Sequence, residues 1–393
     1  MSQFNKRTLS TTIPTAVNNI IRSTAASGTT IKGSSIYENS RAVAEYLLFH
    51  YGKPEELFPH SLKYAPIHAL NFTTRIAHIC GSLLYNISKH EKYENMQDLE
   101  FNDINTTTIS NTSIVNVTRV LDLGCAVGGS SFHLSKYFDE VIGIDYSHLF
   151  IKAANEMKTK NIMEYDVYTE ASDMVLLNAD LPEFIQKDKK YLEKVTFQQG
   201  DGCNLPSSSE IGQFDVILGS NLLCRLPSPR IFLKSLLAGN ESVSTTTDTT
   251  PTSTNININY NGYIKPNGYL VLISPYSWLD EYTPPDEWLF KPNTGTTDTG
   301  TTGTGTTEKS KTYSDNSFIQ LSNYIKEHCH TTTITINNIN NTKTITKYAL
   351  ELFHRDIDGV PFLIREHARK YQFGLSDCTI FKNVIISVDT VPL

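Results

Sequence analysis

A glycine-containing stretch, LDLGCAVGGSS, follows an apolar run near residue 120 and has the residue types of a ligand-binding loop. Asp122 stands two positions before Gly124, and Ala126 and Gly128 follow at the same interval. Glycine lets the backbone approach a ligand closely, and the loop after the first strand of an α/β sheet is a common nucleotide site. A dinucleotide loop has the spacing G-x-G-x-x-G, which Gly124, Gly128 and Gly129 do not match.

An acid two residues before the first glycine is instead typical of loops that bind S-adenosylmethionine. Such a loop faces the zwitterionic methionine end of the ligand, where a carboxylate is tolerated better than beside a pyrophosphate. Ala126 takes the place of the middle glycine in the common G-x-G-x-G form and adds only a methyl group. The alternative interpretation is a tight turn between a strand and a helix that binds no ligand.

Three more polar positions follow later apolar runs. Asp145 ends the next run and is suited to accept hydrogen bonds from two ribose hydroxyls, Asp201 follows the third and can accept from an adenine amino group, and Asn221 follows the fourth. Each acid alone is typical of a helix N-cap or a turn, but together they favour S-adenosylmethionine as the cofactor and a methyltransferase as the class. The expected cofactor-binding residues are Asp122, Gly124, Ala126, Gly128, Asp145, Tyr146, Asp201, Gly202, Asn221 and Leu222.

The elements that must position these residues are short apolar runs and the amphipathic stretches between them. Buried parallel strands are expected at 120–123, 141–145, 195–198, 214–218 and 269–273, with further strands at 348–356 and 377–386. Helices are expected at 38–50, 129–137, 147–158, 229–237 and 315–328. Strands that alternate with helices predict an α/β fold with a doubly wound sheet, which binds ligands outside the carboxyl ends of its strands.

Tracts rich in Thr, Ser and Asn interrupt this pattern. Residues 1–35 are expected to be a disordered leader, and residues 36–388 a single enzyme domain. Low-complexity loop insertions are expected near 102–116, 240–260, 293–312 and 331–345. Closing a longer loop costs only about 0.6 kcal/mol for each doubling of its length, so such tracts are tolerated at surface turns.

Composition excludes several classes of protein. A net charge of -7 and no basic stripe argue against a nucleic-acid partner. The six cysteines are dispersed without metal-ligand spacing, which predicts reduced thiols, no metal site and a cytoplasmic location. A run of about 18 apolar residues is absent from the sequence, so no membrane segment is expected.

Several segments closely resemble one family, the methyltransferase half of the ovothiol-biosynthesis enzyme, which is the 4-mercaptohistidine N1-methyltransferase family. They are VLDLGCAVGGSSFHLSKYFDEVIGIDYSHLFIKAA, NLLCRLPSPR, SPYSWLDEYTP and VPFLIREHARKYQFG. The resemblance covers most of residues 36–385 outside the tracts. It implies a Rossmann-like class I methyltransferase fold, with a mostly parallel seven-stranded sheet, one antiparallel strand and helices on both faces.

The resemblance also implies a reaction, in which the methyl group of S-adenosylmethionine passes to a ring nitrogen of 4-mercaptohistidine, a small amino-acid substrate. Members of the family usually carry a fused sulfoxide synthase half that makes the thiolated precursor, and this sequence lacks it. Either a separate sulfoxide synthase is then the partner, or the acceptor is another small imidazole or thiol. A catalytically silent regulatory module is a third hypothesis, which the presence of all three cofactor acids disfavours.

In the sheet of this family the sixth strand is parallel to the fifth and the seventh is antiparallel, so VPFLIREHARKYQFG would connect them above the crevice. Arg365 and Arg369, four apart if this piece is helical, would then bind the substrate carboxylate, with Arg225 as another candidate. The charged residues could instead form a solvated surface.

Other residues are candidates for acid–base and stacking roles. His367, Glu366 and Glu281 are candidates for the base that takes the ring-nitrogen proton. Tyr276, Trp278 and Tyr282 are expected to form stacking walls for the substrate, with lid packing as the alternative for these aromatic rings. The N-terminal tyrosines at 37, 46 and 51 are expected either to close over the cofactor or to pack on the sheet.

Overall fold

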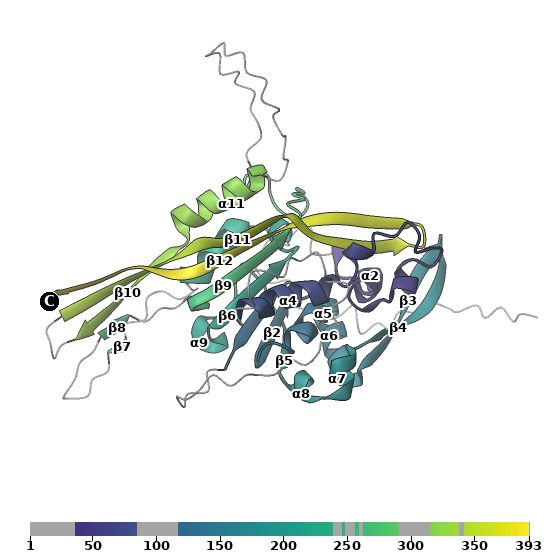
Figure 1. Cartoon of the computed structure of the whole chain (residues 1–393), viewed down its shortest axis with the longest axis horizontal. Coiled ribbons are helices and arrows are strands. Elements are labelled where there is room, and N and C mark those ends of the chain that lie inside the picture. Colours follow the sequence, from purple (N-terminus) through teal and green to yellow (C-terminus); the bar gives the residue numbers. More distant parts are fainter. Residues whose placement is uncertain are drawn as a thin grey trace, which may run out of the picture.

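The computed structural model describes residues 36–84, 117–238, 246–247, 256–258, 262–290, 315–337 and 342–392. The expected leader at 1–35 and the expected insertions at 102–116 and 293–312 lie outside these residues. The centre of the described structure is a ten-stranded sheet with the strand order β5-β2-β1-β6-β9-β12-β11-β10-β8-β7 (Figure 1).

One half of the sheet is parallel. It consists of β5 (Val195–Gln199), β2 (Glu140–Asp145), β1 (Arg119–Leu123), β6 (Phe214–Ser220) and β9 (Ile264–Ser274). These strands are apolar along most of their length because both faces of the sheet are covered, which is the pattern that the apolar runs predicted. The five predicted strands are therefore confirmed.

The other half begins with two long strands. Strand β12 (Lys370–Pro392) pairs antiparallel with β9, and β11 (Thr342–His367) pairs antiparallel with β12, so β11 runs in the direction of β9. This confirms the expected parallel sixth strand and antiparallel seventh strand. The two strands form a long twisted hairpin across the top of the molecule in Figure 1.

The expected count of seven strands is wrong, because β10 (His330–Asn337), β8 (Ile256–Ile258) and β7 (Thr246–Thr247) extend the sheet. Strands β10, β12 and β7 all run against β9, where only one antiparallel strand was expected. The described residues of the stretch 331–345, where a loop insertion was expected, belong to β10 and to the start of β11. The sequence of β10, HTTTITIN, is rich in β-branched residues, which favour a strand over a loop once a partner strand is present.

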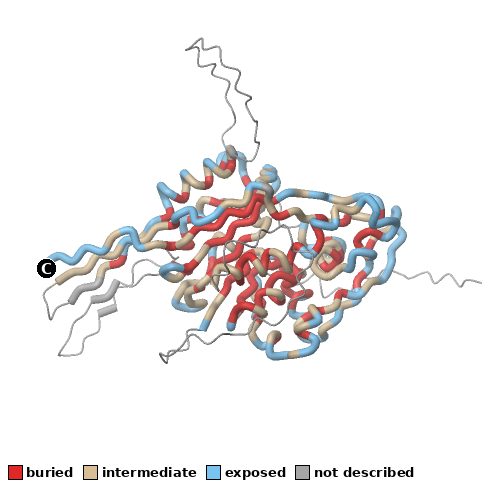
Figure 2. Tube along the Cα trace, viewed as in Figure 1, coloured by how far each residue is buried: buried red, intermediate tan, exposed pale blue. Residues whose placement is uncertain are grey.

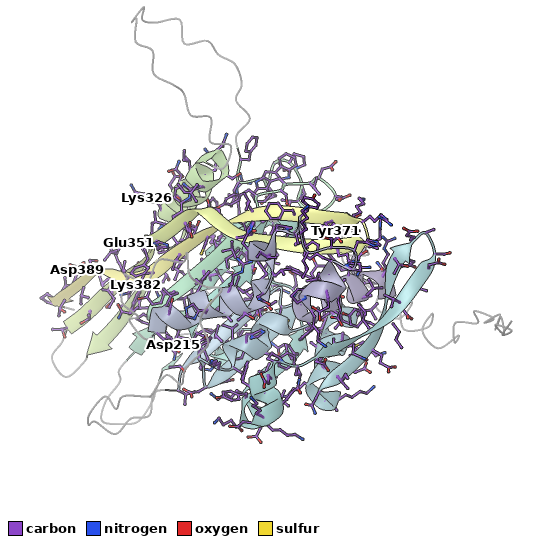
Figure 3. All side chains as sticks on the ribbon, turned by 45° about the vertical axis from the view of Figure 1, so that its right-hand side comes forward. Asp215, Lys326, Glu351, Tyr371, Lys382 and Asp389 are labelled. Atoms are coloured by element: carbon purple, nitrogen blue, oxygen red, sulfur yellow. The ribbon has the colours of Figure 1, made fainter. Side chains whose placement is uncertain are left out.

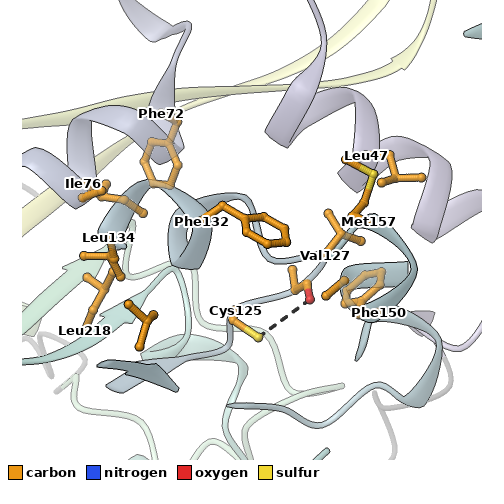
Figure 4. Packing of buried hydrophobic residues seen from close by; sticks show 14 of the residues in the cluster. Leu47, Phe72, Ile76, Cys125, Val127, Phe132, Leu134, Phe150, Met157 and Leu218 are labelled. Atoms are coloured by element: carbon orange, nitrogen blue, oxygen red, sulfur yellow. Dashed lines mark hydrogen bonds between the residues drawn. The ribbon is translucent and has the colours of Figure 1, made fainter. Parts of the chain in front are cut away.

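Helices cover both faces of the sheet (Figures 1 and 2). The strands alternate their side chains, so Val120 of β1 packs into one core and Leu121 into the other. The first core includes Leu47, Phe72 and Phe150 (Figure 4). The helices that were predicted are confirmed as α2 (Ser40–Tyr51), α5 (Gly129–Leu134), α6 (His148–Lys160), α10 (Pro229–Ala238) and α11 (Asp315–His328).

Several described elements were not predicted. The helix α4 (Phe72–Leu84) lies beside α5, and a separate two-stranded sheet is formed by β3 (Ile162–Glu170) and β4 (Asp173–Asp180). The remaining short helices are α3 (Pro54–Leu57), η2 (Ile67–Ala69), α7 (Glu183–Lys187), α8 (Lys190–Glu193), α9 (Ser208–Ile211) and η4 (Leu223–Arg225). None of the helices that the structure describes is both long and apolar enough to span a membrane.

Candidate functional site

A cavity of about 850 Å³ lies at the carboxyl edge of the parallel strands. Four of the strands contribute to its wall at or just after their last residue: Gly124 follows β1, Asp145 ends β2, Asp201 follows β5 and Asn221 follows β6. Ligands of open α/β sheets bind at this edge. The residues predicted from successive strand ends therefore converge on one cavity.

The glycine loop that borders the cavity is held in an unusual backbone conformation. Gly124, Ala126 and Gly128 all have positive φ, with values of 74°, 46° and 87°. Alanine rarely adopts such a conformation, because its Cβ crowds the backbone. A hydrogen bond of 2.9 Å from the Ala126 N–H to Oδ2 of Asp145 holds this residue in place. Gly124 and Ala126 of the loop thus line the cavity with their backbone held in a fixed conformation.

Asp145 has acceptor capacity left for a ligand. Its other oxygen, Oδ1, accepts a hydrogen bond of 2.9 Å from the Ser147 N–H. A carboxylate has about four lone-pair sites, so about two remain after these backbone bonds. Burial raises the pKa of Asp145 to about 6, against the lowering effect of the two N–H donors. The residue can therefore accept from a pair of hydroxyl groups when it is ionised.

Asp122 and Gly128 build the loop and do not line the cavity. Asp122 is buried and accepts hydrogen bonds of 2.6 Å from the hydroxyls of both Ser130 and Ser131. Gly128 precedes α5, and a Cβ there would come within 2.6 Å of the Phe197 ring. We expected both residues to contact the cofactor directly. Instead, Asp122 connects β1 to α5 through these hydrogen bonds, and Gly128 allows the turn that leads into α5.

The other eight expected cofactor residues line the cavity: Gly124, Ala126, Asp145, Tyr146, Asp201, Gly202, Asn221 and Leu222. Oδ1 of Asp201 accepts a hydrogen bond of 2.8 Å from the Cys203 N–H, which fixes the carboxylate at the turn. Asn221 has a positive φ of 52°, and its Oδ1 accepts a hydrogen bond of 2.7 Å from the Ser376 hydroxyl of β12. The far half of the sheet therefore helps to hold this wall.

The segment VPFLIREHARKYQFG does lie at the cavity, but as the end of the β11–β12 hairpin and not as a helix. Side chains alternate along a strand, so Phe362, Ile364 and Glu366 line the cavity. Arg365 points to the other side and is only 1% exposed. Its guanidinium donates to the backbone oxygens of Glu56 and Tyr168, the latter over 3.2 Å. The expectation that Arg365 binds the substrate carboxylate is therefore wrong in geometry.

Arg369 and His367 lie at the tip of the hairpin, outside the cavity lining. Arg369 is exposed and forms an ion pair of 3.1 Å with Glu170 of β3. Nδ1 of His367 accepts from the Arg369 N–H over 3.2 Å, which closes the turn. Tyr371, labelled on the hairpin in Figure 3, stacks on Phe58 with ring centroids 5.1 Å apart. The hairpin tip is thus anchored to β3 and to Phe58, and neither Arg369 nor His367 lines the cavity.

Of the candidate bases, Glu366 and Glu281 remain at the cavity. Glu366 forms an ion pair with Lys370 and accepts a hydrogen bond of 3.0 Å from the Gln372 amide. These interactions, with Lys370 the larger contribution, lower the pKa of Glu366. The Glu366 carboxylate is thus ionised at neutral pH and can accept a hydrogen bond from an N–H group of a ligand.

The aromatic candidates are divided. Tyr282 lines the cavity beside Arg225, whose guanidinium lies 4.7 Å from the Tyr282 ring centroid. Arg225 donates to the Ser277 backbone oxygen over 2.8 Å, and so its head group is oriented. Trp278 turns away and donates from Nε1 to the Ser317 hydroxyl of α11. Tyr276 is likewise outside the lining and packs in the second core.

The N-terminal part of the described structure forms a wall that the sequence only partly indicated. Tyr37 and Tyr46 line the cavity as expected, whereas Tyr51 donates to the Val127 backbone oxygen over 2.7 Å. Helix α2 also contributes residues to this wall that were not predicted, namely Arg41, Ala42, Glu45, Phe49 and His50. The spacing of these residues on the helix could have indicated a shared face, but not which part of the sheet it covers.

Comparisons with known proteins found similarity to solved structures alone. No family model and no curated protein matches the chain. Solved structures that resemble it include phosphoethanolamine N-methyltransferase 1 of Haemonchus contortus in complex with phosphoethanolamine and S-adenosylhomocysteine (14% identity, 68% of this chain, 39% of that chain, TM-score 0.33). A SAM-dependent methyltransferase from Methanosarcina mazei is also similar (15% identity, 69% of this chain, 94% of that chain, TM-score 0.31). So is the cyclase SpnF (15% identity, 40% of this chain, 39% of that chain, TM-score 0.25). The chain spans well under half the length of two of these proteins.

Proposed function

We propose that this chain is a methyltransferase that uses S-adenosylmethionine. The observation that carries the proposal is the convergence of the positive-φ glycine loop with Asp145, Asp201 and Asn221 in one cavity. The three parts of this cofactor need different partners: a close backbone for the amino-acid end, an acceptor pair for the ribose hydroxyls and an acceptor for the adenine amino group. The cavity offers each of them at a separate strand end.

We further propose that the acceptor is 4-mercaptohistidine, methylated on a ring nitrogen. The support for this substrate is the resemblance of the segments quoted above, together with the groups that the cavity offers. Of the three arginines expected to bind the substrate carboxylate, Arg225 lines the cavity, whereas Arg365 and Arg369 lie elsewhere. A guanidinium can bind a carboxylate through two parallel hydrogen bonds.

The residues of the chain must align the acceptor and take up its proton in such a reaction. S-adenosylmethionine, when bound, supplies an electrophilic methyl group on sulfur, so no protein nucleophile is needed. Tyr282 and Phe362 can hold a planar ring between cavity walls and so align its nitrogen with the methyl group, while the more nucleophilic sulfur points away. Glu366 or Glu281 can accept the proton that the ring nitrogen releases. A sulfur-inserting reaction must supply the thiolated precursor.

Mass spectrometry of the full chain incubated with S-adenosylmethionine and 4-mercaptohistidine tests this function. Histidine, ergothioneine and glutathione serve as competing acceptors. We expect ring-methylated mercaptohistidine and an equal amount of S-adenosylhomocysteine. Arg225→Gln should raise the KM for the acceptor about tenfold or more, because a charge-assisted pair is lost, and Arg369→Gln is the matched control outside the cavity.

Two results would argue against the proposal in different ways. Methylation of another imidazole or thiol would keep the enzyme class and change the acceptor. Failure to methylate any of these acceptors, together with no detectable binding of S-adenosylhomocysteine, would contradict the enzyme class itself.

A further inference from the structure

His50 is a cavity residue whose protonation pattern the structure determines. It lies in the last turn of α2, beside the glycine loop, and its Nδ1 is 3.1 Å from the backbone nitrogen of Gly129. The contact is close, because a Cβ on Gly129 would come within 2.7 Å of Nδ1. Since the Gly129 N–H can only donate, Nδ1 must offer its lone pair. The neutral ring therefore carries its proton on Nε2.

Two further observations support a neutral ring. Burial, assisted by the neighbouring His133, lowers the pKa of His50 to about 3. Protonation of Nδ1 would also bring two N–H groups face to face at Gly129. His50 is thus a donor through Nε2 and an acceptor through Nδ1 over the whole neutral range of pH.

The Nε2–H group has no hydrogen-bond partner among the residues that the structure describes, and Nε2 is not a fully buried atom. His50 lines the large cavity with Thr73, Ala126 and Ser130. It also borders a smaller cavity of about 180 Å³. A ligand that expelled water from this wall would have to offer the Nε2–H an acceptor, because an unmet buried N–H costs about 1–3 kcal/mol.

The strand order indicates which part of a ligand lies there. His50 is bonded to the residue that opens α5, directly after the loop of β1, whereas Asp201 follows β5. Strand β2 lies between β1 and β5, so β1 and β5 are about 10 Å apart across the sheet, at about 4.8 Å for each strand step. If Asp201 faces the adenine, His50 lies toward the opposite, amino-acid end of the cofactor.

We infer that His50 is a cofactor-binding residue, whose Nε2–H donates a hydrogen bond to the carboxylate of the amino-acid end of S-adenosylmethionine. This inference rests on the proposed function. The tautomer decides which group is bound: an N–H cannot accept from the ammonium group, so it selects the carboxylate. The same ring holds the Gly129 N–H and thereby links cofactor binding to the start of α5.

Two substitutions separate the two nitrogens. His50→Asn keeps an oxygen near the position of Nδ1 and loses the distal donor, whereas His50→Gln places an amide N–H near the position of Nε2. The probes are S-adenosylhomocysteine and its decarboxylated analogue, which keeps the ammonium group. We expect His50→Asn to weaken S-adenosylhomocysteine binding about tenfold or more and to leave binding of the analogue within about twofold. His50→Gln should recover most of the lost affinity.

Thermal unfolding of each variant shows that the fold is retained. Equal weakening for both probes would overturn the inference in favour of a structural role, and unchanged affinity for both would place the Nε2–H toward the smaller cavity. A wild-type chain that methylates its acceptor while His50→Asn binds S-adenosylhomocysteine normally would overturn this inference alone. A wild-type chain that binds neither probe would overturn the proposed function as well.

Discussion

At the scale of single residues, position at a strand end was more informative than residue type. Asp145, Asp201 and Asn221 could be placed at the cavity from the sequence, because a strand assignment alone fixes where its last residue lies. Arg365 could not be placed in this way. Its direction depends on whether the backbone has a period of about 3.6 or of 2, and a charged run such as REHARK does not distinguish the two.

Arg365→Ala should therefore reduce stability and not substrate affinity. The side chain is buried, and its loss leaves the backbone oxygens of Glu56 and Tyr168 without their donor. We expect a loss of about 2–4 kcal/mol in the free energy of unfolding, measured by chemical denaturation. The matched control is Arg369→Ala, where an exposed ion pair with Glu170 is worth no more than about 1 kcal/mol.

One result for Arg365→Ala would contradict its structural role. If Arg365→Ala unfolds at the denaturant concentration of the wild type and binds the acceptor poorly, then the hairpin presents this arginine to the cavity, and the strand alternation described above is incorrect.

At the scale of elements, local sequence identified five helices and the five strands of the parallel half but missed α4 and the short helices. Pairing between distant segments decided the rest of the sheet. Residues 331–337 resemble a loop by composition, yet as part of β10 they pair with residues 342–348 of β11. The hairpin tip was likewise decided by pairing, with Ile364 opposite Gln372 and Arg365 opposite Tyr371. Contacts of this kind depend on tertiary structure, which overrides local propensity.

The hairpin also supports the cofactor wall through one buried hydroxyl. Ser376 of β12 is fully buried and donates to Oδ1 of Asn221, whose φ is positive. We expect Ser376→Ala to weaken binding of S-adenosylhomocysteine by about 2- to 10-fold, because Asn221 loses the bond that orients it. Isothermal titration calorimetry measures this effect.

The control for this substitution lies on the same strand. The Thr390 hydroxyl is exposed and lies 3.2 Å from the Thr344 hydroxyl at the far end of the hairpin. Thr390→Ala should leave the affinity unchanged. Equal affinities for the wild type and Ser376→Ala would show that Asn221 does not need β12 for its position.

At the scale of the whole molecule, the sequence indicated the order of elements along the chain but not their order in space. Periodicity shows that strands exist, while the antiparallel insertion of β12 between β9 and β11 was expected only from the resemblance to a family. The extension of the sheet joins residues far apart, such as Ile334 and Ile258. The wall formed by α2 is equally non-local, since His50 meets Gly129 across 79 positions of sequence.

The measurement that tests the central claim most directly is a calorimetric titration of S-adenosylhomocysteine into the full chain, with Asp145→Asn and Asp145→Ala as variants. We expect one site per chain, with affinity strongly reduced in Asp145→Ala because the ribose hydroxyls and the Ala126 N–H lose their acceptor. Burial raises the pKa of Asp145 to about 6, so the carboxylate takes up a proton as the pH falls through this value. Wild-type affinity should therefore weaken between pH 7.5 and 5, whereas that of Asp145→Asn should stay nearly constant. Absence of binding by the wild type, or unchanged affinity in Asp145→Ala, would contradict the assignment of this cavity as a methyl-donor site.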